Sequence, residues 1–118
     1  MTTDDDERDL LKINTFLQEN NIKLVYTDAD DNYLDFVQGI VVVSRHQSKK
    51  DIIYTILHEL GHYFSDFFVT EETHTTRVIE EVLAWDGGRD VAYSLRIDID
   101  EEAWKKLMIM SISKYIEK

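Results

Sequence analysis

Residues 39–62 read GIVVVSRHQSKKDIIYTILHELGH, and most of the fold can be predicted by working outward from them. The run Ile40–Val43 is apolar at every position, which is typical of a strand buried on both faces. Ser48 then resembles a helix N-cap, with Asp51 three residues later in the position of a capping box. Apolar residues recur at helical spacing beyond it, which predicts a helix over about residues 49–67.

The N-terminal part of the chain predicts a helix that follows an acidic tail. Residues 1–8 contain the run Asp4–Glu7, and we expect them to form a flexible tail. From Asp9 to about Asn20 the apolar residues follow helical spacing. Two consecutive asparagines then end the predicted helix.

Two further strands are predicted between that helix and the quoted stretch. Residues 22–27 alternate between apolar and polar side chains, as in a strand with one solvated face. Residues 33–37 form the next strand, and a tight turn near Gln38-Gly39 joins it to the strand at 39–44. The predicted sheet is therefore small and three-stranded.

Two more helices are predicted after the quoted stretch, over about residues 71–97 and from Asp98 or Asp100 to Glu117. The order of one helix, three strands and three helices predicts an α+β fold, with the helix that carries residues 58–62 packed on the sheet. Residues 9–118 are expected to form a single domain, because a chain of 118 residues has no room for two independent cores.

The composition excludes several classes of protein. The chain has no cysteine, so any bound metal must be held by histidine and carboxylate side chains. A net charge of -11 argues against direct binding to nucleic acid, which requires clustered Lys and Arg. No apolar run is long enough to cross a membrane, and the polar, acidic start is unlike a signal peptide. We therefore expect a cytoplasmic protein.

The residues His58-Glu59-Leu60-Gly61-His62 carry the chemistry that the sequence predicts. Residues four positions apart lie on one face of a helix, so His58 and His62 project about 6 Å apart, as two ligands of a tetrahedral Zn²⁺ require. Glu59 is rotated away from the metal but can reach a water bound there and act as general base. The pattern predicts a zinc-dependent endopeptidase; otherwise the two histidines are incidental residues of the helix.

A catalytic zinc site needs a third protein ligand and one position left for water. The next predicted helix offers Glu80 and Glu81, 18 and 19 residues beyond His62. The two glutamates point about 100° apart on a helix, so at most one can be the ligand. His74, near the predicted start of that helix, is a third candidate or else a solvated histidine. The spacing does not decide among the three.

Proteolysis also requires a donor for the tetrahedral oxyanion and a surface for the substrate. The candidate donors also have ordinary packing or surface roles, and they are Tyr54, Tyr63, Tyr93, Arg77 and Arg89. An edge strand within residues 33–44 could bind an extended substrate by strand addition.

The strand at 39–44, the charged link and the helix at 53–64 resemble the ImmA/IrrE-type metallopeptidase domain. Residues 80–85 resemble that family's second characteristic stretch, in which a glutamate precedes an alanine, and the resemblance covers roughly residues 40–94. It implies a small, gluzincin-like, intracellular zinc peptidase of bacteria or phages. It also implies the site residues His58, Glu59, His62 and Glu81.

The resemblance also bears on the partner and on the third ligand. Some members of the family cleave DNA-binding repressors, so the implied partner is a protein or peptide substrate such as a DNA-binding regulator. The family often carries Glu-Ala-Asn where this chain has Leu83-Ala84-Trp85, which leaves the choice between Glu80 and Glu81 open.

Two other functions fit the same sequence. The first is a metal-containing binding module without catalysis. The second is an acidic regulator that mimics DNA, suggested by the net charge of -11 and by the acidic clusters at Asp4–Glu7 and Asp28–Asp35.

Overall fold

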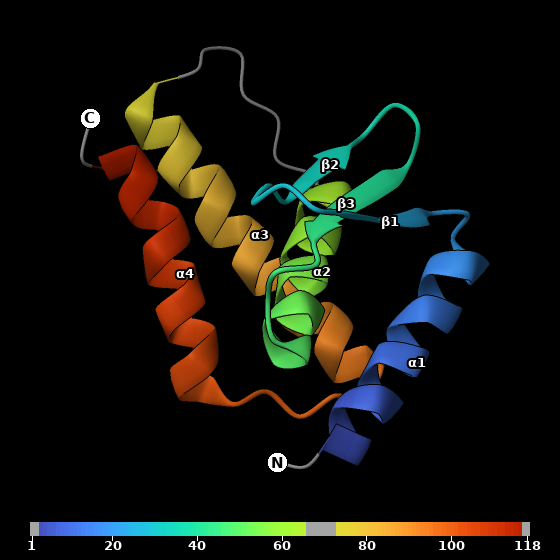
Figure 1. The fold of residues 1–118 in the computed structure, drawn as a ribbon. Helices are drawn as coiled ribbons and strands as arrows, with labels where there is room; N and C mark the ends of the chain where they lie inside the picture. The colour runs from blue at the N-terminus through green and yellow to red at the C-terminus, as the bar shows by residue number, and fades with distance from the viewer. Residues whose placement is uncertain (1–2, 66–72, 117–118) are drawn as a thin grey trace.

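The computed structural model describes residues 3–65 and 73–116 (Figure 1). It has the α+β architecture predicted from the sequence, with one helix, a three-stranded sheet and three further helices. In chain order the elements are α1 (Thr3–Glu19), β1 (Lys23–Thr27), β2 (Tyr33–Asp35), β3 (Ile40–Ser44), α2 (Lys49–Tyr63), α3 (His74–Ser94) and α4 (Glu101–Ile116).

The sheet is mixed, with strand order β1-β3-β2. The central strand β3 is parallel to β1 and antiparallel to β2. The predicted hairpin between β2 and β3 is present, and its turn contains Gly39 with a φ of 66°. The Gln38 backbone N–H also donates to Asp35 Oδ1 at 3.0 Å, which closes the turn. Since β3 is central, β2 lies at one edge of the sheet.

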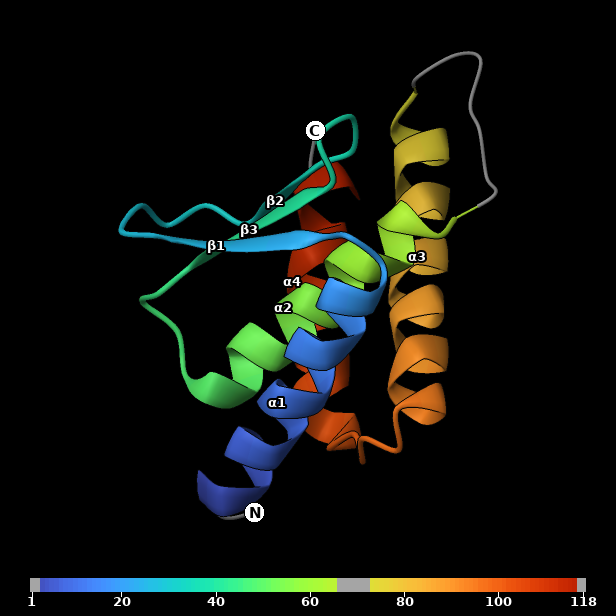
Figure 2. The same cartoon turned by 90° about the vertical axis from the view of Figure 1, so that its right-hand side faces the viewer.

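The core lies between the sheet and the helices that pack on it. Val41 and Val43 of β3 are fully buried, as the unbroken apolar run predicts. The helix α2 contacts α1, β2, β3 and α3, and therefore occupies the centre of the molecule. Figure 1 shows α3 between α4 and α2, with α1 on the far side of α2, and Figure 2 shows α1 beneath β1.

The N-terminal residues correct one prediction. The helix α1 begins at Thr3, so a helix start at Asp9 after a flexible tail over residues 1–8 is wrong for the described part of that segment. The acidic run lies in the first turns of α1, where negative side chains are stabilised by the positive end of the helix dipole. Lys49 also donates to Glu7 at 3.0 Å and ties this end of α1 to the start of α2.

The starts of α2, α3 and α4 follow from side-chain caps. Ser48 accepts a hydrogen bond from the Asp51 backbone N–H, as predicted. Thr73 caps α3, and the Thr76 side chain bonds back to the Thr73 backbone N–H. Of the two candidate caps for α4, it is Asp100 whose carboxylate accepts from the first backbone N–H groups of the helix.

The helices α2 and α3 end earlier than the apolar pattern predicts. The helix α2 ends at Tyr63 instead of residue 67, and α3 ends at Ser94 instead of residue 97. Residues 66–72, which include the remainder of the first prediction and the predicted start of α3, lie outside the described residues. Within the described ranges no helix is both long and apolar enough to cross a membrane.

Glycines let α2 and α3 touch backbone to backbone. A Cβ atom on Gly61 would lie 1.8 Å from the carbonyl oxygen of Ala84, and one on Gly88 would lie 2.5 Å from the carbonyl oxygen of Leu57. The helix α3 continues through Gly87 and Gly88, so the predicted weakness there does not break it. The absence of side chains at this contact sets the short distance between α2 and α3.

Candidate metal centre

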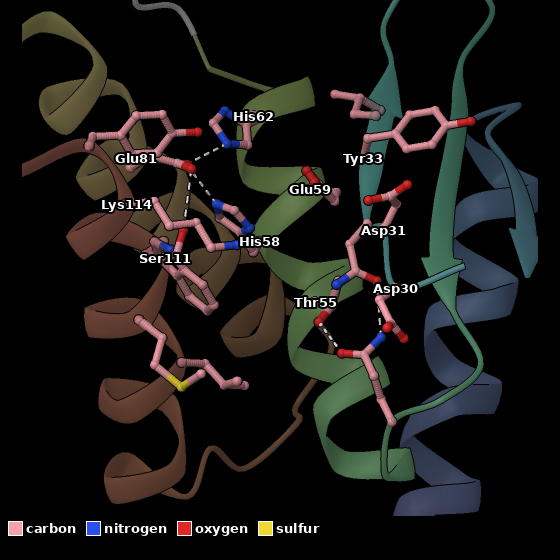
Figure 3. A pocket seen from close by; sticks show the side chains of 17 residues that line it. Asp30, Asp31, Tyr33, Thr55, His58, Glu59, His62, Glu81, Ser111 and Lys114 are labelled. Carbon is pink, nitrogen blue, oxygen red and sulfur yellow. Dashed lines mark hydrogen bonds and ion pairs between the residues drawn. The ribbon is translucent and has the colours of Figure 1, made fainter. Parts of the chain in front are cut away.

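Two histidines of α2 and one glutamate of α3 form the centre of the site (Figure 3). His58 and His62 lie on the same face of α2, one turn apart, with their ring centroids 4.7 Å from each other. Their Nε2 atoms lie 2.9 Å and 2.8 Å from the same oxygen, Oε2 of Glu81. Three donor groups from two helices therefore meet at one point.

Glu81 is held as a carboxylate by this arrangement. Its side chain is almost completely buried, with 6% of the residue surface exposed. Burial by itself would raise the pKa of Glu81, but the hydrogen bonds and positive charge of His58 and His62 outweigh it and hold the pKa well below the ordinary value. Conversely, burial would lower the pKa of His62, while the Glu81 carboxylate raises it above the ordinary value.

The donor set fits a divalent metal ion. The ligand atoms of His58, Glu59 and His62 lie within 4.8 Å of one another, and this cluster could hold a metal. Glu81 Oε2 also lies within that distance of both imidazoles, at 2.9 Å from Nε2 of His58 and 2.8 Å from Nε2 of His62. A tetrahedral ion with bonds of about 2.0 to 2.1 Å separates its ligand atoms by roughly 3.3 Å, so an opening of about 0.5 Å would admit the ion. Two imidazoles with a carboxylate suit zinc or iron by ligand type.

Glu59 lies beside the histidines but faces a different direction. Its carboxylate points to the side of α2 that faces β2 and Asp31, whereas the histidines point toward Glu81 (Figure 3). The residue is 6% exposed, and this burial raises the pKa of Glu59, although the nearby histidines lower it. A carboxylate with a raised pKa accepts a proton more readily, as a general base must.

The other two candidates for the third ligand are not brought to the histidines in this way. Glu80 points about 100° away from Glu81 on the helix. Its Oε1 atom is buried without a hydrogen-bond partner in the part of the chain that the structure describes. His74 is the exposed first residue of α3 and lies seven residues, or about 10 Å along the helix axis, before Glu81. Glu81 is therefore the third donor that the fold places at the centre.

Aromatic rings fix the orientation of the His58 imidazole. The indole of Trp85 stacks on the imidazole of His58, with ring centroids 4.2 Å apart and planes only 10° from parallel. Trp104 of α4 meets Trp85 edge-on at 5.0 Å. Both tryptophans are buried, so the plane of the His58 ring is fixed by packing.

The centre opens into a cleft of about 680 Å³ between the edge of the sheet and α4. Asp30, Asp31 and Tyr33 line the side near β2, and Ser111 and Lys114 line the side formed by α4 (Figure 3). The cleft lies within the size range of sites that enclose small molecules or short peptide segments.

The side chains of α4 are the part of the site that sequence reasoning missed. Ser111, Lys114 and Tyr115 line the cleft, and Ser111 Oγ donates to Glu81 Oε1 at 3.3 Å. Burial and the neighbouring Glu81 carboxylate raise the pKa of Tyr115. The spacing of these residues, with Leu107 one turn earlier, places them on one face of α4, but the same spacing is typical of packing residues.

Within the part of the chain that the structure describes, none of the oxyanion donors expected from the sequence lines the cleft. Tyr54 is buried and accepts a hydrogen bond from the Asp100 backbone N–H at 2.8 Å. Tyr63 packs against the ring of Phe36, and Tyr93 is 85% exposed. Arg77 lies over the ring of Tyr115, and Arg89 pairs with Glu101.

Comparison of the chain with models of known families, with curated proteins and with solved structures finds no match. The resemblance to ImmA/IrrE-type domains therefore rests on the motifs of the sequence, and the site must be interpreted from its own geometry.

Proposed function

We propose that this chain is a zinc-dependent endopeptidase of the cytoplasm that cleaves a specific protein. The observation that supports this most strongly is the convergence of Glu81 Oε2 on the Nε2 atoms of His58 and His62, at 2.9 Å and 2.8 Å. A glutamate in the position of a general base, Glu59, lies next to the first histidine. The resemblance of the motifs to the ImmA/IrrE-type domain supports the same function.

The residues that would hold zinc are His58, His62 and Glu81. When bound, zinc supplies a Lewis acid that polarises the scissile carbonyl and lowers the pKa of a bound water. A catalytic site with three protein ligands leaves its fourth position to water, unlike a structural zinc site, which is closed by four side chains. All three donors reach the cleft, so water and substrate have access to them.

Glu59 would take the proton from the attacking water and deliver it to the leaving nitrogen of the peptide. Its burial supports this role because a raised pKa brings a carboxylate nearer to the ideal value for a general base at neutral pH. Lys114 and Tyr115 are the cleft residues best suited to donate a hydrogen bond to the oxyanion. They replace the donors expected from the sequence.

The shape and charge of the cleft favour an extended, basic segment of a protein. β2 is an edge strand beside the cleft, and an extended peptide can add to such an edge through backbone hydrogen bonds. Asp30 and Asp31 are exposed on this side, and the whole chain carries a net charge of -11. A basic DNA-binding regulator would complement this charge.

The first test measures the zinc content of purified protein and cleavage of a quenched-fluorescence peptide library rich in Lys and Arg. We expect one zinc per chain in the wild-type protein and in Glu59→Gln. We expect cleavage by Glu59→Gln to fall by at least about 100-fold, because only the general base is lost. Glu80→Gln is the matched control, since it neutralises a neighbouring carboxylate outside the centre.

The outcomes of this test separate the proposal from its rivals. Folded wild-type protein without zinc would contradict the proposal, as would undiminished cleavage by Glu59→Gln. A non-catalytic metal-binding module would retain zinc but show no cleavage by the wild-type protein. An acidic DNA mimic would compete with DNA for a basic protein, and high salt would abolish the competition.

A further inference from the structure

We propose that Ser111 is a positioning residue that orients Glu81 in the metal centre. Its hydroxyl donates to Oε1 of Glu81 at 3.3 Å, while the other carboxylate oxygen, Oε2, faces His58 and His62. The two oxygens of Glu81 therefore have different partners, on α4 and on α2. This inference rests on the proposed metal site. It concerns how α4, which supplies none of the three proposed ligands, influences the binding of the metal.

A second serine on the same helix shows what is unusual about Ser111. Ser113 donates to the carbonyl oxygen of Ile109 at 2.7 Å, which is the ordinary bond of a helical serine to the residue four positions earlier. Ser111 reaches instead across the junction to a side chain of α3. It is half-buried and lines the cleft. The hydroxyl thus serves the contact between two helices.

The physical role of this bond follows from the chemistry of carboxylate ligands. A carboxylate can bind a metal through one oxygen or through both. A donor on Oε1 favours binding through Oε2 alone, which leaves the fourth position of a tetrahedral site for water. Glu81 and Ser111 both line the cleft, so a water molecule can replace the hydroxyl in part, but it would not hold Oε1 in one fixed orientation as a side chain of α4 does.

The experiment measures the zinc dissociation constant by competition with a chromophoric chelator. We expect Ser111→Ala to weaken zinc binding by about 10-fold, at the low end of the effect of outer hydrogen-bond partners. The low end is expected because 3.3 Å is longer than a typical O–H···O distance. Alanine is a stronger helix former than serine, so the variant should fold, and circular dichroism checks this.

Two further variants distinguish positioning from general packing. Ser113→Ala removes the same hydroxyl from the same helix and should leave the zinc affinity unchanged. Ser111→Thr keeps the donor and should restore most of the affinity. An equal loss in Ser113→Ala, or no rescue by threonine, would overturn the role of Ser111.

A double-mutant cycle tests whether Ser111 acts through Glu81. In the Glu81→Ala background, measured by calorimetry at millimolar zinc, adding Ser111→Ala should cause no further loss of affinity. A second 10-fold loss in that background would show that the serine acts by another route. If wild-type protein and Ser111→Ala bound zinc with equal affinity, this inference alone would be overturned. Wild-type protein that binds no zinc would overturn both the inference and the proposed function.

Discussion

The two junctions of α3, with α2 and with α4, are built in opposite ways. At the first junction, glycines remove the side chains, and the backbones of α2 and α3 come into direct contact at Gly61 and Gly88. At the second, side chains fill the space between the helices. Trp104 packs edge-on against Trp85, and Arg89 donates to Glu101 at 2.6 Å and 2.8 Å.

The histidines and Glu81 depend on a backbone contact, whereas the residues that α4 adds to the site depend on side-chain contacts. The distance between the backbone segments that carry the histidines and Glu81 depends on the contact of α2 with α3, which no rotamer change can adjust. The contributions of α4 depend on side chains, which can move or be exchanged at moderate cost. The first junction therefore determines whether the centre can form, and the second modifies how it works.

The largest effect is expected for Gly61→Ala. The added methyl would lie 1.8 Å from the Ala84 carbonyl oxygen, so α2 and α3 would have to separate. We expect the free energy of unfolding to fall by roughly 3 kcal/mol or more, measured by urea denaturation, together with loss of zinc binding by the folded fraction.

Neighbouring glycines supply the comparison for that prediction. Gly88→Ala places its methyl 2.5 Å from the Leu57 carbonyl oxygen and should be the next most damaging. Gly87→Ala places its methyl 3.1 Å from the Cα of Gly61, and the higher helix propensity of alanine offsets part of its cost. If Gly61→Ala were as stable as Gly87→Ala, the backbone contact would not determine the helix distance.

A smaller effect is expected for Tyr54→Phe, which changes the contact of α2 with the start of α4. The phenol accepts from the Asp100 backbone N–H at 2.8 Å and lies edge-on to Trp104. Removing the hydroxyl should lower the free energy of unfolding by about 1 kcal/mol at pH 7, measured by urea denaturation. Zinc affinity should stay unchanged, and a loss as large as that of Gly61→Ala would mean that side-chain contacts with α4 matter as much as the backbone contact of α2 with α3.

The same tyrosine predicts a dependence on alkaline pH. Burial raises the pKa of Tyr54 above its ordinary value of 10.0, so the folded chain holds the phenol proton more tightly than the unfolded chain. This contribution to stability is fully present below about pH 10 and is lost as the pH rises through the folded pKa. The difference in stability between the wild-type protein and Tyr54→Phe should therefore shrink above pH 10, and a growing difference would show the opposite sign.

The smallest effect is expected for Arg89→Ala at the surface of the α3–α4 junction. The Arg89–Glu101 pair is well formed but exposed, and exposed ion pairs contribute little. We expect the melting temperature to change by no more than about 2 °C, and the change to diminish in 1 M NaCl. A large shift that persists in 1 M NaCl would mean that the packing of Arg89 over the Trp104 ring, 5.6 Å from its centroid, holds α4, and not the ion pair.

Local patterns in the sequence predicted the order of the helices and strands, and they placed the two histidines on one face of a helix. The apolar run Ile40–Val43 indicates a buried strand wherever it lies, because every position must avoid water. Ser48 caps the helix that follows through bonds within three residues. The spacing of His58 and His62 places them on one helix face by the geometry of a single helix. Each of these predictions needs only residues that are close in the chain.

The third donor and the wall formed by α4 required the tertiary structure. Glu80 and Glu81 are equivalent in sequence, and only the rotation and approach of α3 against α2 turn Glu81 toward the histidines. Ser111 lies 30 residues from Glu81, and its spacing looks like that of any packing residue. The sequence by itself determined which groups could bind a metal. Their meeting was decided by the glycine contact of α2 with α3, because distances between elements depend on how surfaces fit together, which no local pattern encodes.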